Sequence, residues 1–211
     1  MKIILMSLVS IGSFVSLSGN AQTSMPSDRD MAGFSWEIAA PTSNKFLNET
    51  SLSGWRFEYR KGIKHNLTVG IAISWNAFDE FFPTTTYMSA NQTKAITSDM
   101  IRQVYTLPIT LITHYYFSTS SKLLQPYAGL GVGAQYAEHN AFLNIYELSE
   151  TNWGFVARPE FGTLLSFGSH SPIKGMVGVG YNISTNKNEA FDIKGWNHLT
   201  FNVGIGIGNG L

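Results

Sequence analysis

The stretch Trp55-Arg56-Phe57-Glu58-Tyr59-Arg60 alternates strictly between aromatic and charged residues. Successive side chains of a β-strand point to opposite faces, so a repeat of two residues predicts a strand. One face of this strand is aromatic and the other is charged. The fold therefore depends on which of the two faces meets the surroundings of the protein.

The same repeat of two residues recurs in seven further stretches, at 34–38, 67–75, 106–117, 128–136, 153–168, 177–183 and 199–207. Most approach the roughly 9–11 residues with which a tilted strand crosses a bilayer. The connections alternate between long ones, at 41–51, 78–102, 137–152 and 184–196, and short ones, at 61–65, 118–125 and 169–173. Long loops on one side and short turns on the other are typical of outer-membrane proteins. The predicted fold class is all-β, an eight-stranded antiparallel up-and-down transmembrane β-barrel.

The composition indicates which face points outward. Only 13% of the 211 residues are charged and the net charge is zero, whereas a soluble domain usually has about 25% charged residues. A soluble barrel buries its apolar face and needs a charged outer face. Here the second face of the strands holds mainly Gly, Ser, Thr, Asn and Ala, which suit the narrow interior of an eight-stranded barrel. We therefore expect the bulky face to meet lipid.

Aromatic residues near the strand ends support this orientation, because aromatic girdles mark both membrane interfaces of such barrels. If both termini lie on the periplasmic side, the outer girdle comprises Trp55, Trp75, Tyr136, Trp153 and Trp196. The inner girdle comprises Tyr59, Tyr115, Phe117 and Phe167.

The N-terminus reads as a secretory signal peptide, residues 1–21. Lys2 precedes the apolar stretch Ile3–Leu17, and Gly19-Asn20-Ala21 is a small-residue cleavage site. An N-terminal membrane helix is the alternative, but the apolar run is short and interrupted by serines. Residues 22–32 are expected to be a flexible N-terminal segment and residues 33–211 the barrel domain. The expected location after signal removal is the outer membrane.

The chain resembles the small eight-stranded outer-membrane barrels of the OmpA, OmpX and OmpW type, often called the porin family. The resemblance rests on the signal peptide, on Gln125–Gly133 (QPYAGLGVG) and on the glycine-rich last stretch Leu199–Gly208. It implies a Gram-negative cell-envelope protein. Many such barrels end on an aromatic residue, whereas this chain ends Gly208-Asn209-Gly210-Leu211.

The small-residue face also carries the charges expected inside the lumen, namely Glu37, Arg56, Glu58, Arg60, Arg158 and Glu160. Buried charges persist only when they are paired and hydrogen-bonded. We therefore predict a structural network in which Arg56 or Arg158 bridges Glu58 or Glu160 across the lumen. A gate or narrow ion path and a ligand site are the alternatives. His114 and His198 are expected to face the lumen as packing residues.

Catalytic and metal sites are not predicted. Lipid A deacylases have a His-Ser-Glu set around a Tyr-x-His-x-Ser-Asn-like stretch, and the nearest stretch here, Tyr181–Asn186, lacks the histidine. The absence of cysteine excludes thiolate metal sites, and no cofactor is expected. The charge distribution provides no basic face for nucleic acid.

The function expected from these observations is that of a non-enzymatic integral outer-membrane protein, with a structural, anchoring or surface-interaction role through its extracellular loops. A narrow pore or transporter for small solutes is one alternative, and a lipid A-modifying enzyme is the other. The expected partners are the lipid bilayer and lipopolysaccharide, with a surface or envelope protein as a further candidate. We expect a monomer.

Overall fold

The computed structural model describes residues 30–42, 46–88, 95–118, 123–144, 146–168 and 171–208. The predicted signal peptide, 1–21, and residues 22–29 lie outside the described residues. None of the described residues belongs to a helix long and apolar enough to span a membrane. The strands are β1 (Met31–Thr42), β2 (Ser51–Lys64), β3 (Leu67–Met88), β4 (Ala95–Tyr116), β5 (Leu124–Leu143), β6 (Tyr146–Ser166), β7 (Ile173–Ser184) and β8 (Asn197–Gly208).

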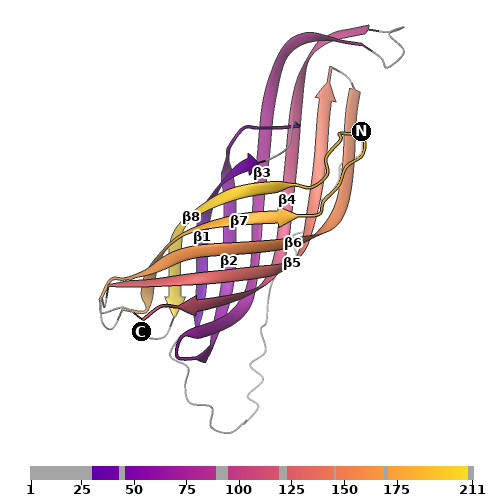
Figure 1. The fold of residues 1–211 in the computed structure, drawn as a ribbon. Coiled ribbons are helices and arrows are strands. Elements are labelled where there is room, and N and C mark those ends of the chain that lie inside the picture. The colour runs from indigo at the N-terminus through magenta and orange to yellow at the C-terminus, as the bar shows by residue number, and fades with distance from the viewer. Residues whose placement is uncertain are drawn as a thin grey trace, which may run out of the picture.

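These eight strands form one closed antiparallel barrel, in which each strand pairs with the next and β8 pairs with β1 (Figure 1). The predicted fold class is confirmed. Strand β1 begins at Met31, so the last two residues of the expected flexible segment 22–32 belong to the barrel. Closure pairs every strand with a neighbour on both sides, so the described part of the barrel wall has no sheet edge.

The alternation predicted from the sequence separates two chemically different faces. On the outer face Phe57, Leu111 and Phe155 are 45%, 67% and 78% exposed. On the inner face Ser35 and Arg56 are at most 2% exposed. Apolar side chains outside and polar side chains inside are the arrangement of a barrel whose solvent is lipid.

Two of the predicted long loops are in fact strands. The stretch 78–102 belongs largely to β3 and β4, and the stretch 137–152 to β5 and β6. Register continues through both stretches, for example from Glu80 to Arg102 and from Glu138 to Thr151. Charged residues there resemble a loop in sequence, but a strand that extends into water can carry them.

Strands β3 to β6 have 20 to 22 residues, whereas β1, β7 and β8 have 12. The outer ends of the four long strands therefore rise beyond the rest of the barrel (Figure 1). We call this part the outer sheet and define it as residues 76–88, 95–106, 137–143 and 146–155.

The inside of the barrel is layered. Near the inner end lies an apolar cluster of Met31, Tyr116, Tyr127, Leu164 and Met176. Toward the outer end lies a second one, the outer apolar cluster, formed by Ala39, Phe46, Leu47, Phe78, Val104, Ile193 and Trp196. The charged residues lie between these clusters in the strand register.

Trp196 corrects one prediction. Its side chain is completely buried in the outer apolar cluster, so it is not part of an aromatic girdle. His198 and Thr200 of β8 are also completely buried. Trp196 shares their parity, which places it on the inner face although its position near a strand end resembles that of a girdle residue.

Candidate functional site: a charge network in the lumen

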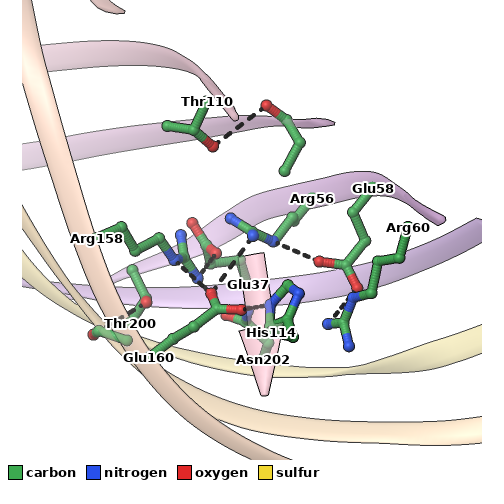
Figure 2. Close-up of polar contacts among 12 residues, drawn as sticks. Glu37, Arg56, Glu58, Arg60, Thr110, His114, Arg158, Glu160, Thr200 and Asn202 are labelled. Atoms are coloured by element: carbon green, nitrogen blue, oxygen red, sulfur yellow. Dashed lines mark hydrogen bonds and ion pairs between the residues drawn. The ribbon is translucent and has the colours of Figure 1, made fainter. Parts of the chain in front are cut away.

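Glu160 of β6 connects several strands inside the lumen. Its Oε2 lies 3.2 Å from Nε of Arg158 and 3.4 Å from Nη2 of Arg56, which comes from β2. Its Oε1 contacts Nε2 of His114 on β4. Figure 2 shows these side chains converging on the carboxylate from different sides of the barrel.

Glu58 continues the network toward the inner end. It accepts a hydrogen bond from Nε of Arg56 at 3.1 Å and pairs with Nη2 of Arg60 at 2.5 Å. Arg60 also donates to the hydroxyls of Tyr116 and Tyr127, at 3.0 and 3.3 Å. The charged layer is thereby tied to the inner apolar cluster.

Glu37 of β1 continues the network toward the outer end. Its Oε2 lies 2.7 Å from Nη2 of Arg158, and its Oε1 accepts a hydrogen bond of 2.8 Å from Nδ2 of Asn76 on β3. Nη2 of Arg158 is also 3.3 Å from Oδ1 of Asn202 on β8. The network therefore reaches from one side of the barrel to the other.

The charges of this layer balance. Three carboxylates (Glu37, Glu58, Glu160) face three guanidiniums (Arg56, Arg60, Arg158), and each of the six residues is at most 5% exposed. Removing such groups from water is costly, and only pairing with several hydrogen bonds offsets the cost. The arrangement is therefore chemically suited to cross-link the strands that surround it.

Two glycines make room for this layer. A Cβ atom at Gly129 would lie 2.5 Å from Cδ2 of His114 and 2.9 Å from Cγ of Glu160. A Cβ atom at Gly180 would lie 2.9 Å from Nε of Arg158. Part of the high glycine content thus serves the close packing of large charged side chains in a narrow barrel.

Glu58, His114 and Glu160 could offer metal ligands, because one ligand atom from each lies within 4.8 Å of the others. Both carboxylates, however, already contact guanidinium groups. A bound cation would have to compete with these arginines at very short range, so the electrostatics favour the ion pairs over a metal ion.

The structure brings all six predicted lumen residues into one network. It adds Asn76, Tyr116, Tyr127 and Asn202, which the sequence reasoning missed. The parity of their strands places them on the inner face, but an uncharged Asn or Tyr on that face does not by itself indicate a partner for a buried charge. Their hydrogen bonds to buried charges need the three-dimensional arrangement to be recognised.

The predicted girdle residues other than Trp196 are at least partly exposed. Trp55, Tyr59, Tyr115, Phe117, Trp153 and Phe167 are 37% to 67% exposed, and Trp75 and Tyr136 are partly buried by neighbours. Trp75 stacks on Tyr105 with ring centroids 5.7 Å apart, and Tyr136 contacts Trp153 at 5.5 Å. These rings cover the outer face where the outer sheet begins.

No protein-family model and no curated protein matches the chain. Among solved structures, Neisserial surface protein A is similar, with a TM-score of 0.51, 14% identity and coverage of 85% of this chain and 95% of that one. The Yersinia pestis attachment invasion locus protein Ail, solved with the heparin analogue sucrose octasulfate, has a TM-score of 0.44 and 14% identity, with 84% and 95% covered. The N-terminal barrel domain of Pseudomonas aeruginosa OprF has a TM-score of 0.42 and 11% identity, with 85% and 100% covered.

At such identities the likeness to Neisserial surface protein A shows the fold. The exposed apolar outer face adds a physical argument, since lipid is the solvent that such a surface fits. The chain has the fold of the small eight-stranded outer-membrane β-barrels, and its exposed apolar outer face is that of a transmembrane barrel.

Proposed function

We propose that this protein is a non-enzymatic outer-membrane protein that displays the outer sheet for interaction with another macromolecule at the cell surface. The observation that carries the proposal is the length of β3 to β6. A strand of 22 residues extends about 70 Å. A tilted strand needs only about 9–11 residues to cross the bilayer, so much of each long strand serves another purpose.

The surface of the outer sheet supports an interaction role. Phe81, Tyr146 and Leu148 are 61%, 61% and 47% exposed, although they lie beyond the girdle residues Trp75 and Trp153. Phe81 projects from one face of the outer sheet and Tyr146 and Leu148 from the other. Both faces therefore present exposed apolar side chains outside the membrane, which mark interaction surfaces. Glu147 and Glu150, which are also exposed, give the same strand an acidic character, so we expect the partner surface to be basic and partly apolar.

The charge network has a structural role in this proposal. It holds the barrel wall from which the outer sheet rises, and its large side chains occupy the middle of the lumen. Because the charges pair with one another, the layer needs no ion or substrate for neutralisation.

Site-specific photocrosslinking in intact cells tests the interaction role. A photoreactive residue at Phe81 or Leu148 should give adducts with another macromolecule at the cell surface. The same residue at Leu111, on the membrane face of β4, is the matched control and should label lipid. Adducts from Leu111 but none from the outer sheet would contradict the proposal.

A narrow pore is the second candidate, and the polar, charged inner face favours it. Conductance across a planar bilayer distinguishes the two functions. The proposed function predicts no reproducible unitary steps. Steps that change with substitution of Arg158 would support a pore instead.

Lipid A mass spectrometry tests the non-enzymatic part of the proposal. Outer membranes with and without the protein should have the same lipid A species. In the structure His114 contacts Glu160 and Tyr127 inside the lumen, where lipid has no access. A new lipid A species that depends on the protein would overturn this part.

A further inference from the structure

The outward face of the outer sheet, which continues the lipid-facing side of the barrel, carries an apolar stripe. Phe81 on β3 pairs with Ile101 on β4, and Ile101 pairs with Phe142 on β5. Phe81 and Ile101 are 61% and 40% exposed, and Phe142 is partly exposed. Directly paired residues have their side chains about 5 Å apart on one face of a sheet. The three side chains therefore form a continuous surface that crosses the strands, which we call the outer stripe.

The outer stripe lies beyond the lipid. Phe81 follows the girdle residue Trp75 by six positions, and Phe142 follows the girdle residue Tyr136 by six positions. Six residues of a strand extend about 20 Å. The stripe is thus an apolar surface in water, and such a surface favours a partner that covers it.

Carboxylates surround the outer stripe. Asp79 precedes the stripe residue of β3 by two positions and lies on its membrane side, whereas Asp99 precedes that of β4 by two positions and lies on its far side. Glu147 pairs with the stripe residue of β5 and closes the end of the stripe. All three acids are exposed, and none of them forms an ion pair within the described part of the chain.

The cationic residues of the outer sheet belong to its other face. Arg102 and His139 are the only Lys, Arg or His residues among the described residues of the outer sheet. Arg102 donates a hydrogen bond to the carbonyl oxygen of Phe46, and the ring of His139 packs against Phe46 and Trp196 inside the barrel. The outward face therefore combines apolar and acidic side chains, which is complementary to a basic and apolar partner.

Asn140 provides an independent sign of a missing donor on this face. It pairs with Gln103 in the row between the outer stripe and the membrane, and it is 4% exposed. Its Nδ2 donates a hydrogen bond of 2.9 Å to Oε1 of Glu138, while its Oδ1 accepts none within the described residues. Buried polar atoms are normally hydrogen-bonded, so this oxygen favours a partner that brings N–H groups.

The dimensions of the face fit an α-helix. The outer stripe spans two strand spacings, about 10 Å, and helix positions i, i+4 and i+7 extend over about the same length. Asp79 and Asp99 lie about 7 Å to either side of the stripe along the strands. Basic side chains on the flanks of a helix about 10–12 Å wide can reach both of them.

We propose that the outward face of the outer sheet binds a cationic amphipathic helix of a partner polypeptide. The apolar side chains of the helix pack on the outer stripe, and its basic flanks pair with Asp79, Asp99 and Glu147. This inference rests on the proposed interaction role and specifies the face and the class of partner.

Calorimetric titration of the protein in zwitterionic lipid nanodiscs, with empty nanodiscs as the blank, tests the partner class. The probe is the N-acetylated, C-amidated peptide Lys-Leu-Lys-Ala-Lys-Leu-Ala-Ala-Leu-Lys-Ala-Lys, whose leucines share one helix face between basic flanks. A peptide of the same composition with its leucines on different sides of the helix is the matched control and should bind at least about tenfold more weakly. Equal binding of the two peptides would overturn the proposal, and so would the absence of binding at about 1 mM probe.

Protein variants locate the binding on one face. The double substitution Phe81→Ser with Ile101→Ser should weaken binding at least about tenfold, and Glu147→Gln should weaken it about threefold. Leu148→Ser and Glu150→Gln remove an exposed apolar and an exposed acidic side chain from the other face of β6. These two matched controls should leave the affinity unchanged. Equal losses on both faces would contradict the proposal.

Photocrosslinking in intact cells separates this inference from the proposed function. Adducts with a polypeptide from a photoreactive residue at Phe81, reduced by Glu147→Gln, are the expected result. Adducts from Leu148 but none from Phe81 would overturn the helix site and leave the interaction role intact. The absence of adducts from both positions would overturn the interaction role as well.

Discussion

Nη2 of Arg158 lies 2.7 Å from Oε2 of Glu37, although the two residues are 121 positions apart in the sequence. Arg158 belongs to β6 and Glu37 to β1, and these strands are not neighbours in the barrel. The contact therefore crosses the lumen. This ion pair and the one between Arg56 and Glu160 join opposite sides of the barrel wall. The backbone hydrogen bonds, in contrast, join only neighbouring strands.

Removal of Arg158 should destabilise the barrel strongly. Arg158→Ala leaves the carboxylates of Glu37 and Glu160 without this partner in a buried layer, and such a loss costs about 3–5 kcal/mol. The measurement is the free energy of unfolding in urea, in detergent micelles. Lys64→Ala, at an exposed position, is the control and should change it by less than about 0.5 kcal/mol.

Two glycines of β5 should respond differently to the same substitution. Gly129→Ala forces Cβ against His114 and Glu160, so it should cost about 1–3 kcal/mol through overpacking. A Cβ atom at Gly131 meets Ile112 at 3.4 Å and Thr110 at 3.5 Å, which is ordinary van der Waals contact. Gly131→Ala is thus the matched control. Equal effects of the two substitutions on urea unfolding would contradict the proposed role of Gly129.

A charged residue introduced on the outer face should destabilise the barrel where that face meets lipid, but not on the outer sheet beyond the membrane. Leu111 is 67% exposed on the membrane part of β4, and Leu111→Arg should cost about 2–4 kcal/mol. Phe81 is 61% exposed on the outer sheet, and Phe81→Arg should have little effect on stability. The yield of folded protein on a heat-modifiability gel compares the two variants, and the reverse order would contradict the placement of the membrane.

The outer apolar cluster should weaken in acid because the His139 ring packs against two of its members, Phe46 and Trp196. His139 lies three positions beyond the girdle residue Tyr136 and therefore outside the membrane, and burial lowers its pKa to about 4. The unfolded chain binds the proton near pH 6.5. Neutral His139 therefore makes its full contribution to the free energy of unfolding above pH 6.5. This contribution is lost as the pH falls toward 4, which lowers the free energy of unfolding by up to about 3 kcal/mol.

Urea unfolding at pH 7.5 and at pH 4.5 measures this pH dependence. His139→Leu should reduce the difference between the two conditions. His65→Leu, at an exposed position of the inner turn, should leave it as in the unchanged protein. An undiminished pH dependence in His139→Leu would show that other groups cause it.

The alternation in the sequence was sufficient to predict the barrel and the inner position of its charges. Arg56 and Glu58 alternate with aromatic residues along one strand. If the aromatic side chains point outward to lipid, the repeat of two residues places the charged side chains on the inner face. The partners across the lumen could not be predicted in full, because the tilt and stagger of the strands decide which side chains meet. The pair between Glu37 and Arg158 therefore needed the structure.

Two further features could not be predicted from the sequence, namely the extension of β3 beyond the membrane and the inward position of Trp196. Asp79 and Glu80 resemble loop residues, but they lie on β3 outside the membrane, where charge in a strand has little cost. Trp196 resembles a girdle residue, but its parity with His198 turns it inward. In both cases composition near a strand end was a weaker guide than the strand register.

A double-mutant cycle on Glu37 and Arg158 tests the central claim most directly, namely that the charge network holds opposite sides of the barrel together. The measurement is the free energy of unfolding of the unchanged protein, of Glu37→Gln, of Arg158→Gln and of the double variant. The structure predicts a coupling energy of about 1–3 kcal/mol, as expected for residues in one network. Effects that add to within about 0.5 kcal/mol would contradict the claim.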